Sequence, residues 1–250
     1  MPTMKADDDI IKNIQQSLER MKGQLRVLES NVSVEKQMEY FQYSERIRKN
    51  STQEQTPIEE QIAALNNPDA TTEELKHIMV CLAGSVDVAS YRALETYAQA
   101  PHLELEDWAS MALMEARVAL ESDLSDEKQI FISTGLGGRG SKLRFFALLS
   151  SSELEPFSPY QRELVEREFP FFLEKFNIEI ESLVIEENYI TLVFLINFSM
   201  NMKQALEEAV TECNQYGDFL NSRYLITNTK IYNREEIEEE LKKRNQEDNL

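Results

Sequence analysis

The chain has 250 residues, of which 42% are hydrophobic, so it can form one large domain or two modest ones with buried cores. Its 26 Lys and Arg against 45 Asp and Glu give a formal net charge of -19, which argues against a nucleic-acid partner. No apolar run is long enough to cross a bilayer and no basic, apolar leader is present, so we expect a cytoplasmic protein without a membrane partner.

The amino-terminal segment has apolar residues at alternating spacings of three and four, which is the heptad pattern of a coiled coil. Two interpretations remain open. The segment is either a dimerisation helix, which would give a homodimer, or an amphipathic helix that packs on its own domain, and Gly23 weakens the helix in both. The heptad positions are Ile11, Ile14, Leu18, Met21, Leu25, Leu28 and Val32.

Helical patterns continue to about residue 123. Residues 34–49 are predicted as a second helix, and residues 50–55 contain no apolar residue and are predicted as a linker. Four short helices follow, and their length and turns resemble HEAT-type helical repeats. Their predicted starts are Thr56 with Pro57 at the first helical position, the cap from Thr71 to Glu74, Asp87 and Leu105.

Several short runs in this part of the chain resemble a family of uncharacterised bacterial proteins. The resemblance covers about residues 56–150 and implies no activity and no catalytic residues. The runs that carry it are Glu74 to Gly84, Tyr91 to Glu95, Asp107 to Ala109, Ala119 to Ser122 and Ser133 to Gly138.

Beyond Asp126 the apolar period changes from 3.6 to 2, which predicts strands separated by helices. Apart from the first strand, the order strand-helix-strand-strand-helix-strand is that of a ferredoxin-like antiparallel sheet. The first strand would add to its edge through a glycine hairpin. The predicted strands are 129–134, 142–150, 179–185, 189–198 and 223–231, and the predicted helices are 158–176, 201–220 and 234–244, the last with a capping box of Asn233 and Glu236.

The predicted fold class is therefore α + (α+β), with HEAT-like helical hairpins followed by a ferredoxin-like antiparallel sheet that carries one extra strand. Four domains or segments are expected. They are a helical heptad segment at 1–50, a HEAT-like helical domain at 51–127, a ferredoxin-like domain at 128–233 and a charged carboxy-terminal helix or tail at 234–250.

Four of the seven glycines lie between Gly135 and Gly140. They match G-x-G-x-x-G, but a dinucleotide site needs a helix next, whereas residues 142–150 predict a strand. A kinase-like loop lacks its His-Arg-Asp and Asp-Phe-Gly partners, and the P-loop order is reversed. Two interpretations remain, a flexible hairpin turn or a ligand loop that uses backbone N–H groups. The candidate ligand-binding residues are Gly135, Gly137, Gly138, Arg139, Gly140 and Lys142, and Arg139, Lys142 and Arg144 form a local basic patch.

No metal, cofactor or catalytic residue is predicted. Glu74 and His77 form a Glu-x-x-His pair, but a di-iron site needs a second such pair and His102 is the other histidine. Neither histidine has a recognisable nucleophile beside it. Cys81 and Cys213 are far apart in helical patterns and are expected to be buried core residues.

Because no consistent catalytic set is found, the sequence predicts a non-enzymatic protein-interaction or scaffold protein with a protein partner or self-association. The alternative is a regulatory or catalytic domain that binds a phosphorylated small ligand at the loop from Gly135 to Lys142.

Overall fold

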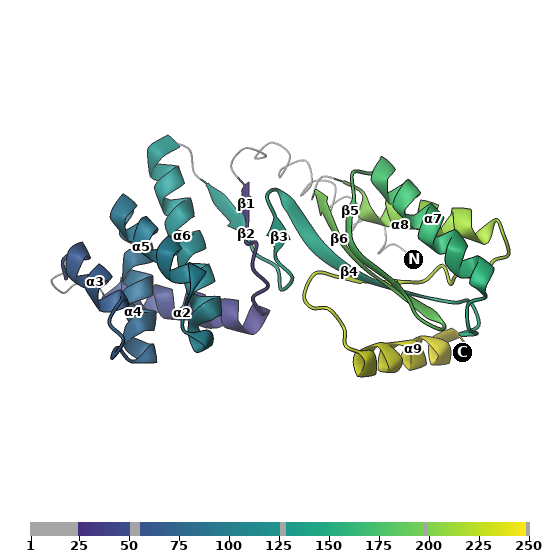
Figure 1. The fold of residues 1–250 in the computed structure, drawn as a ribbon, viewed down its shortest axis with the longest axis horizontal. Coiled ribbons are helices and arrows are strands. Elements are labelled where there is room, and N and C mark those ends of the chain that lie inside the picture. Colours follow the sequence, from purple (N-terminus) through teal and green to yellow (C-terminus); the bar gives the residue numbers. More distant parts are fainter. Residues whose placement is uncertain (1–24, 51–55, 126–128, 198–199, 249–250) are drawn as a thin grey trace, which may run out of the picture. The chain divides into compact units, whose positions relative to one another are not determined.

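The computed structural model describes residues 25–50, 56–125, 129–197 and 200–248 of the chain. These residues fall into two compact units that meet in the chain between Gly140 and Ser141. We call residues 25–140 the helical unit and residues 141–248 the sheet unit. Helices come first and an antiparallel sheet follows, as the sequence predicts (Figure 1).

The helical unit is built around α6, which packs against α2, α4 and α5. Its largest buried side chain is Trp108, and the rings of Tyr40 and Tyr43 meet that indole edge to face at centroid distances of 5.2 Å each. Such pairs stabilise a core beyond their buried area. The helices are α2 (Val34–Asn50), α3 (Ile58–Leu65), α4 (Thr72–Ala83), α5 (Val88–Gln99), the short 3₁₀ helix η1 (Leu103–Leu105) and α6 (Glu106–Ser125).

Local capping explains where two of these helices begin. Thr71 and Glu74 form the predicted capping box at α4, and the side chain of Asp87 accepts a hydrogen bond from Ser90 N at α5. The start of α3 differs from the prediction by one residue. Pro57 occupies the cap position and Thr56 lies outside the helix, because a proline favours the extended backbone seen at that position.

The predicted heptad helix does not continue through its last positions. Leu25–Val27 forms strand β1, which pairs in parallel with β2 (Ile130–Ile132). The following residues Leu28 and Val32 are buried in the core of the helical unit, so they are not part of a coiled-coil seam. The positions from Ile11 to Met21, and the predicted linker after Asn50, lie outside the described residues.

The pairing of β2 also corrects the prediction of an extra strand. The segment 129–134 does not add to the antiparallel sheet, because its central residues pair with β1. Strand pairing depends on contacts far apart in the sequence, and alternation alone does not choose the partner. The two-residue strand β3 (Gly138–Arg139) follows before the boundary between the units.

In the sheet unit, four strands are ordered β7-β4-β6-β5, and all neighbours are antiparallel. The strands alternate with two helices in the chain as predicted, although the last strand is shorter than the predicted 223–231. The elements are β4 (Lys142–Ser150), α7 (Pro159–Lys175), β5 (Glu179–Ile185), β6 (Tyr189–Asn197), α8 (Met202–Asn214), β7 (Leu225–Thr227) and α9 (Arg234–Asp248).

Helix α8 ends six residues before the predicted 220. The side chain of Asn214 donates a hydrogen bond to Leu220 O and accepts one from Leu220 N, both at 2.8 Å. Gly217 between them has φ 138°, which glycine adopts readily. The chain therefore leaves the helix in a loop closed by Asn214.

Strand β4 is buried on both faces. Ala147 and Leu149 lie in the core that α7 and α8 share with the sheet. Phe146 faces the other side and stacks on Tyr232, with ring centroids 5.7 Å apart, and α9 lies across that side with Ile237 and Leu241 buried (Figure 1). The sequence of a strand that is buried on both faces is a nearly continuous apolar run, and the sequence of β4 has this pattern.

A reciprocal pair of hydrogen bonds marks the start of α9. The predicted capping box at α9 is present, since Asn233 and Glu236 exchange backbone-to-side-chain hydrogen bonds of 3.0 Å.

Of the helices described, none combines the length and the apolar content that a membrane crossing requires.

The turn at residues 135–140 requires glycine at position 137, because another backbone segment approaches it closely. Gly137 has φ 62°, its N–H donates to Thr134 O, and a Cβ there would lie 2.5 Å from Ser30 O and 2.8 Å from Leu28 O and Glu29 O. A side chain at Gly137 would therefore both strain the turn and collide with the segment after β1.

Replacing Gly137 by Ala is expected to lower the free energy of unfolding by about 2–5 kcal/mol, because left-handed strain and overpacking add. Gly140, with φ 61° and no atom within 4 Å of the place that a Cβ would occupy, is the matched control. Gly140→Ala should cost about 1–2 kcal/mol, from backbone strain alone. Urea unfolding followed by the fluorescence of Trp108, the single tryptophan, measures both; equal losses would contradict the steric account.

Candidate functional site

The glycine turn was the candidate ligand site in the sequence. Gly135 to Gly138 are buried, whereas Arg139 and Gly140 are exposed, and the N–H of Gly140 donates to the Glu29 carboxylate at 3.3 Å. Lys142 binds the Glu179 carboxylate at 2.5 Å and Asn177 O at 3.2 Å, and Arg139 also has a partner. Ligand binding at these residues stays a prediction, and an incoming anion would have to displace carboxylates of the chain itself.

The other cation of the predicted basic patch is held in the same way. Arg144 on β4 forms a bidentate pair with Glu181, with Nε–Oε2 and Nη2–Oε1 distances of 2.5 and 3.0 Å. The two side chains are only 21% and 23% exposed. A β-bulge lies between Ile180 and Ser182 of β5, at Glu181, and the hydrogen bonds that Arg144 donates to that carboxylate raise the pKa of Arg144.

These two ion pairs cover apolar surface. Arg144 lies opposite Leu195 of β6, and Leu195 lies opposite Glu179 of β5. The pairs Lys142–Glu179 and Arg144–Glu181 therefore cross β6 on either side of Leu195, which has no exposed surface. Long cationic side chains commonly shield apolar surface with their methylene groups. The basic patch is thus part of the sheet's own cover.

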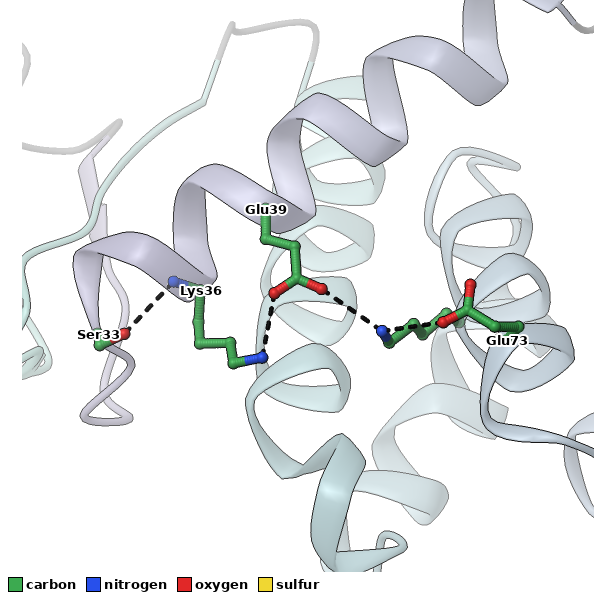
Figure 2. A network of polar contacts seen from close by, with 5 residues as sticks. Ser33, Lys36, Glu39 and Glu73 are labelled. Carbon is green, nitrogen blue, oxygen red and sulfur yellow. Dashed lines mark hydrogen bonds and ion pairs between the residues drawn. The ribbon is translucent and has the colours of Figure 1, made fainter.

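A second group of charges joins α2 to α4 in the helical unit. Figure 2 shows Lys36 beside Glu39, and the backbone N–H of Lys36 beside Ser33 Oγ at 3.3 Å. Lys76 lies 3.4 Å from Glu39 and 3.1 Å from Glu73, and its ammonium stands 4.9 Å from the centre of the Trp108 indole.

The pKa shifts of two members of this group, Glu39 and Lys76, favour their charged forms. The hydrogen bond from Lys36 lowers the pKa of Glu39. Partial burial by itself lowers the pKa of Lys76, but its bonds to Glu73 and Glu39 outweigh burial and raise it. A general acid or base needs a pKa near the working pH, so this network is a structural clamp between two helices.

The cysteines offer no activated nucleophile. Cys213 is fully buried, and burial raises the pKa of its thiol to about 12. Cys81 is only half-buried, which corrects the expectation of two core cysteines, and desolvation raises its pKa as well. Its Sγ lies 3.6 Å from Nε2 of His77. Within the part of the chain that the structure describes, no three His, Cys, Asp or Glu side chains gather as metal ligands.

The most unusual surface lies on the helical layer of the sheet unit. Tyr160, Phe171 and Tyr216 each expose 55% of their surface, although aromatic rings elsewhere in this unit pack in its core. Tyr160 and Phe171 share one side of α7 with Arg167 and Lys175, at spacings of seven, four and four residues. We call Tyr160, Arg167, Phe171, Lys175 and Tyr216 the aromatic surface.

Contacts tie the cations to these rings. The ammonium of Lys175 stands 4.3 Å from the centre of Phe171 and 3.9 Å from that of Phe172. The pKa of Arg167 is raised chiefly by its hydrogen bond to Glu168, and electrostatic interactions with Tyr216 and Tyr160 also contribute. Arg167 also forms an ion pair with Glu168 at 2.8 Å. The aromatic surface combines stacking planes with positive charge.

Sequence reasoning missed this surface. It assigned the apolar face of α7 to buried positions such as Phe169 and Leu173, and both are indeed buried. Phe171 lies off that stripe, and an aromatic residue off the apolar stripe is the signal that marks exposure.

Comparison with known proteins finds no matching family model and no matching curated protein. Among solved structures, the chain is similar to a putative transposase from Deinococcus radiodurans R1, at 13% identity and a TM-score of 0.36, covering 41% of this chain and 90% of that one. It is also similar to a REP-associated tyrosine transposase bound to a REP hairpin, at 9% identity and a TM-score of 0.31. That match covers 39% of this chain and 61% of the other.

These findings overturn two predictions from the sequence. One of these two structures is a transposase and the other a putative transposase, so the prediction of a non-enzymatic scaffold with a protein partner is not retained. One of them is bound to a REP hairpin, so the prediction that excluded nucleic acid is withdrawn as well. At TM-scores of 0.36 and 0.31 the similarity assigns no activity to this chain, and its function has to be argued from its own residues.

The cover over Leu195 can be tested with two substitutions of one residue. Arg144→Ala removes both the charge and the methylene stem, and should lower the free energy of unfolding by about 1 kcal/mol. Arg144→Met keeps most of the stem and should lose less than about half of that. Urea unfolding followed by circular dichroism compares them; equal losses would show that the charge, and not the cover, stabilises the sheet.

Proposed function

We propose that the sheet unit binds single-stranded nucleic acid through the aromatic surface. The observation that carries the proposal is the set of three aromatic side chains, Tyr160, Phe171 and Tyr216, each 55% exposed and accompanied by two cations. Proteins that bind single strands stack bases on such rings and hold the backbone with positive charge.

The cost of exposing Phe171 supports a role outside the core. Burying a Phe side chain stabilises a fold by about 1.5–3 kcal/mol relative to exposing it. Its neighbour Phe172 packs against the core, whereas Phe171 stands edge-on to it at a centroid distance of 5.3 Å. Single exposed apolar residues are ordinary, but three exposed aromatic rings, one of them in contact with the ammonium of Lys175, form a surface suited to planar ligands.

The charge of the sheet unit favours a single strand over a duplex. Residues 141–250 contain 12 Lys and Arg against 21 Asp and Glu, so the unit is acidic and lacks the cations that neutralise the phosphates of a double helix. Bases of a single strand are accessible for stacking, which depends less on charge. Two phosphate contacts, from Arg167 and Lys175, would give a slope of about -1.4 in log K against log salt.

The layers of the sheet unit favour the side of α7 and α8 as the nucleic-acid interface. Strand order β7-β4-β6-β5 with helices after β4 and β6 supports a ferredoxin-like arrangement, in which RNA-recognition modules use the open face of the sheet. Here Phe146 and Leu148 on that face are buried on the side of α9.

In the helical unit, the contacts between α3 and α4 and between α5 and α6 support an arrangement of HEAT-like hairpins.

Fluorescence anisotropy with a labelled single strand of mixed sequence, as DNA and as RNA, tests this proposal on the full chain at low salt. Phe171→Ala, Tyr160→Ala and Tyr216→Ala should each weaken binding about 5- to 150-fold, equivalent to the loss of about 1–3 kcal/mol of stacking per base. Lys175→Gln should flatten the salt slope by about 0.7.

Ile231→Ala and Val184→Ala are matched controls, because these residues of the same unit are 50% and 44% exposed and lie outside the aromatic surface. They should leave the affinity unchanged, and a duplex of the same sequence should compete poorly. Absence of binding by the unaltered chain, or equal losses in the control variants, would refute the proposal.

A further inference from the structure

Helix α4 presents a histidine and a cysteine to the same side. His77 and Cys81 are four residues apart, a spacing that puts their side chains next to each other on a helix. Nε2 of His77 and Sγ of Cys81 are 3.6 Å apart, His77 is exposed and Cys81 is half-buried. Both atoms are good ligands for zinc-like cations, and solvent reaches the imidazole.

The separation of the two atoms fits a tetrahedral metal site. Zinc binds His nitrogen at about 2.0–2.1 Å and Cys sulfur at about 2.3 Å, and a tetrahedral angle between those bonds puts the two ligand atoms about 3.6 Å apart. The observed distance is 3.6 Å. Two ligands four residues apart on one helix are also the arrangement by which the H-E-x-x-H helix of metalloproteases holds zinc.

We propose that Nε2 of His77 and Sγ of Cys81 together bind one divalent cation of the zinc class, such as zinc or cadmium. The cation replaces the thiol proton, which is released to solvent, and the imidazole carries its remaining proton on Nδ1. Because the described residues bring no third His, Cys, Asp or Glu into a group with these two, the other coordination positions belong to water or to a ligand from outside the chain.

Helix α4 prepares this pair before any cation binds. Its start is held by the capping box of Thr71 and Glu74, and its opposite side is anchored in the core by Leu75, Met79 and Leu82. A helix fixed in this way keeps the two ligands close without a further change in the backbone, so little conformational entropy is lost on binding. Glu73, one turn before His77, is held by Lys76 at 3.1 Å.

Cadmium titration of the reduced full chain, followed by the ultraviolet thiolate-to-cadmium absorption band, tests the site. We expect one cadmium ion per chain, displaced by zinc. Cys81→Ser should abolish the band. His77→Ala should weaken binding at least about tenfold, which corresponds to about 1.4 kcal/mol. Because His77 is exposed, its variant should keep the circular dichroism of the unaltered chain.

The chain has one further cysteine and one further histidine, and these are the controls. Cys213→Ala and His102→Ala should bind cadmium as the unaltered chain does, because Cys213 is fully buried and His102 lies outside α4. Three outcomes would overturn the proposal. They are no band in the unaltered chain, a band that survives in Cys81→Ser, or unchanged affinity in His77→Ala, which would leave a single thiolate as the ligand.

Discussion

The sheet unit depends on covering both faces of one apolar strand. β4 carries Ala147 and Leu149 on one side and Phe146 and Leu148 on the other, and all four are buried. Exposing either face would forfeit the hydrophobic stabilisation of several large side chains. Helices α7 and α8 therefore pack on one side and α9 on the other, which makes the unit three layers thick (Figure 1).

Because both faces of the sheet are covered, only some of its charged and aromatic side chains remain accessible to a ligand. The cations Lys142 and Arg144 are used to shield Leu195, and their charges are met by Glu179 and Glu181. The outer side of α7 has no covering partner among the described residues, so its exposed rings and Lys175 are available to a ligand, whereas Arg167 is paired with Glu168. The helical unit likewise contains both paired and accessible groups. Lys76 is paired with Glu39 and Glu73, whereas the imidazole of His77 is exposed.

Much of the fold could be predicted because its signals are local. The capping boxes at Thr71 and Asn233 and the apolar run of β4 act within a few residues of the chain, and all three are present. The candidate site could not be predicted in the same way. The position of Phe171 off the apolar stripe of α7 indicates exposure, but only the tertiary structure shows that no other described element covers it.

The sequence by itself determined the helical first half, the alternating strands and helices of the second, and the glycine-rich turn between them. Tertiary structure alone decided that β1 pairs with β2, that Gly137 must lack a side chain because carbonyl oxygens of residues 28–30 fill its place, and that Arg144 meets Glu181. The physical reason is sequence separation. Periodicity and capping are set by neighbouring residues, whereas strand partners, close backbone contacts and ion pairs depend on which distant segments the core brings together.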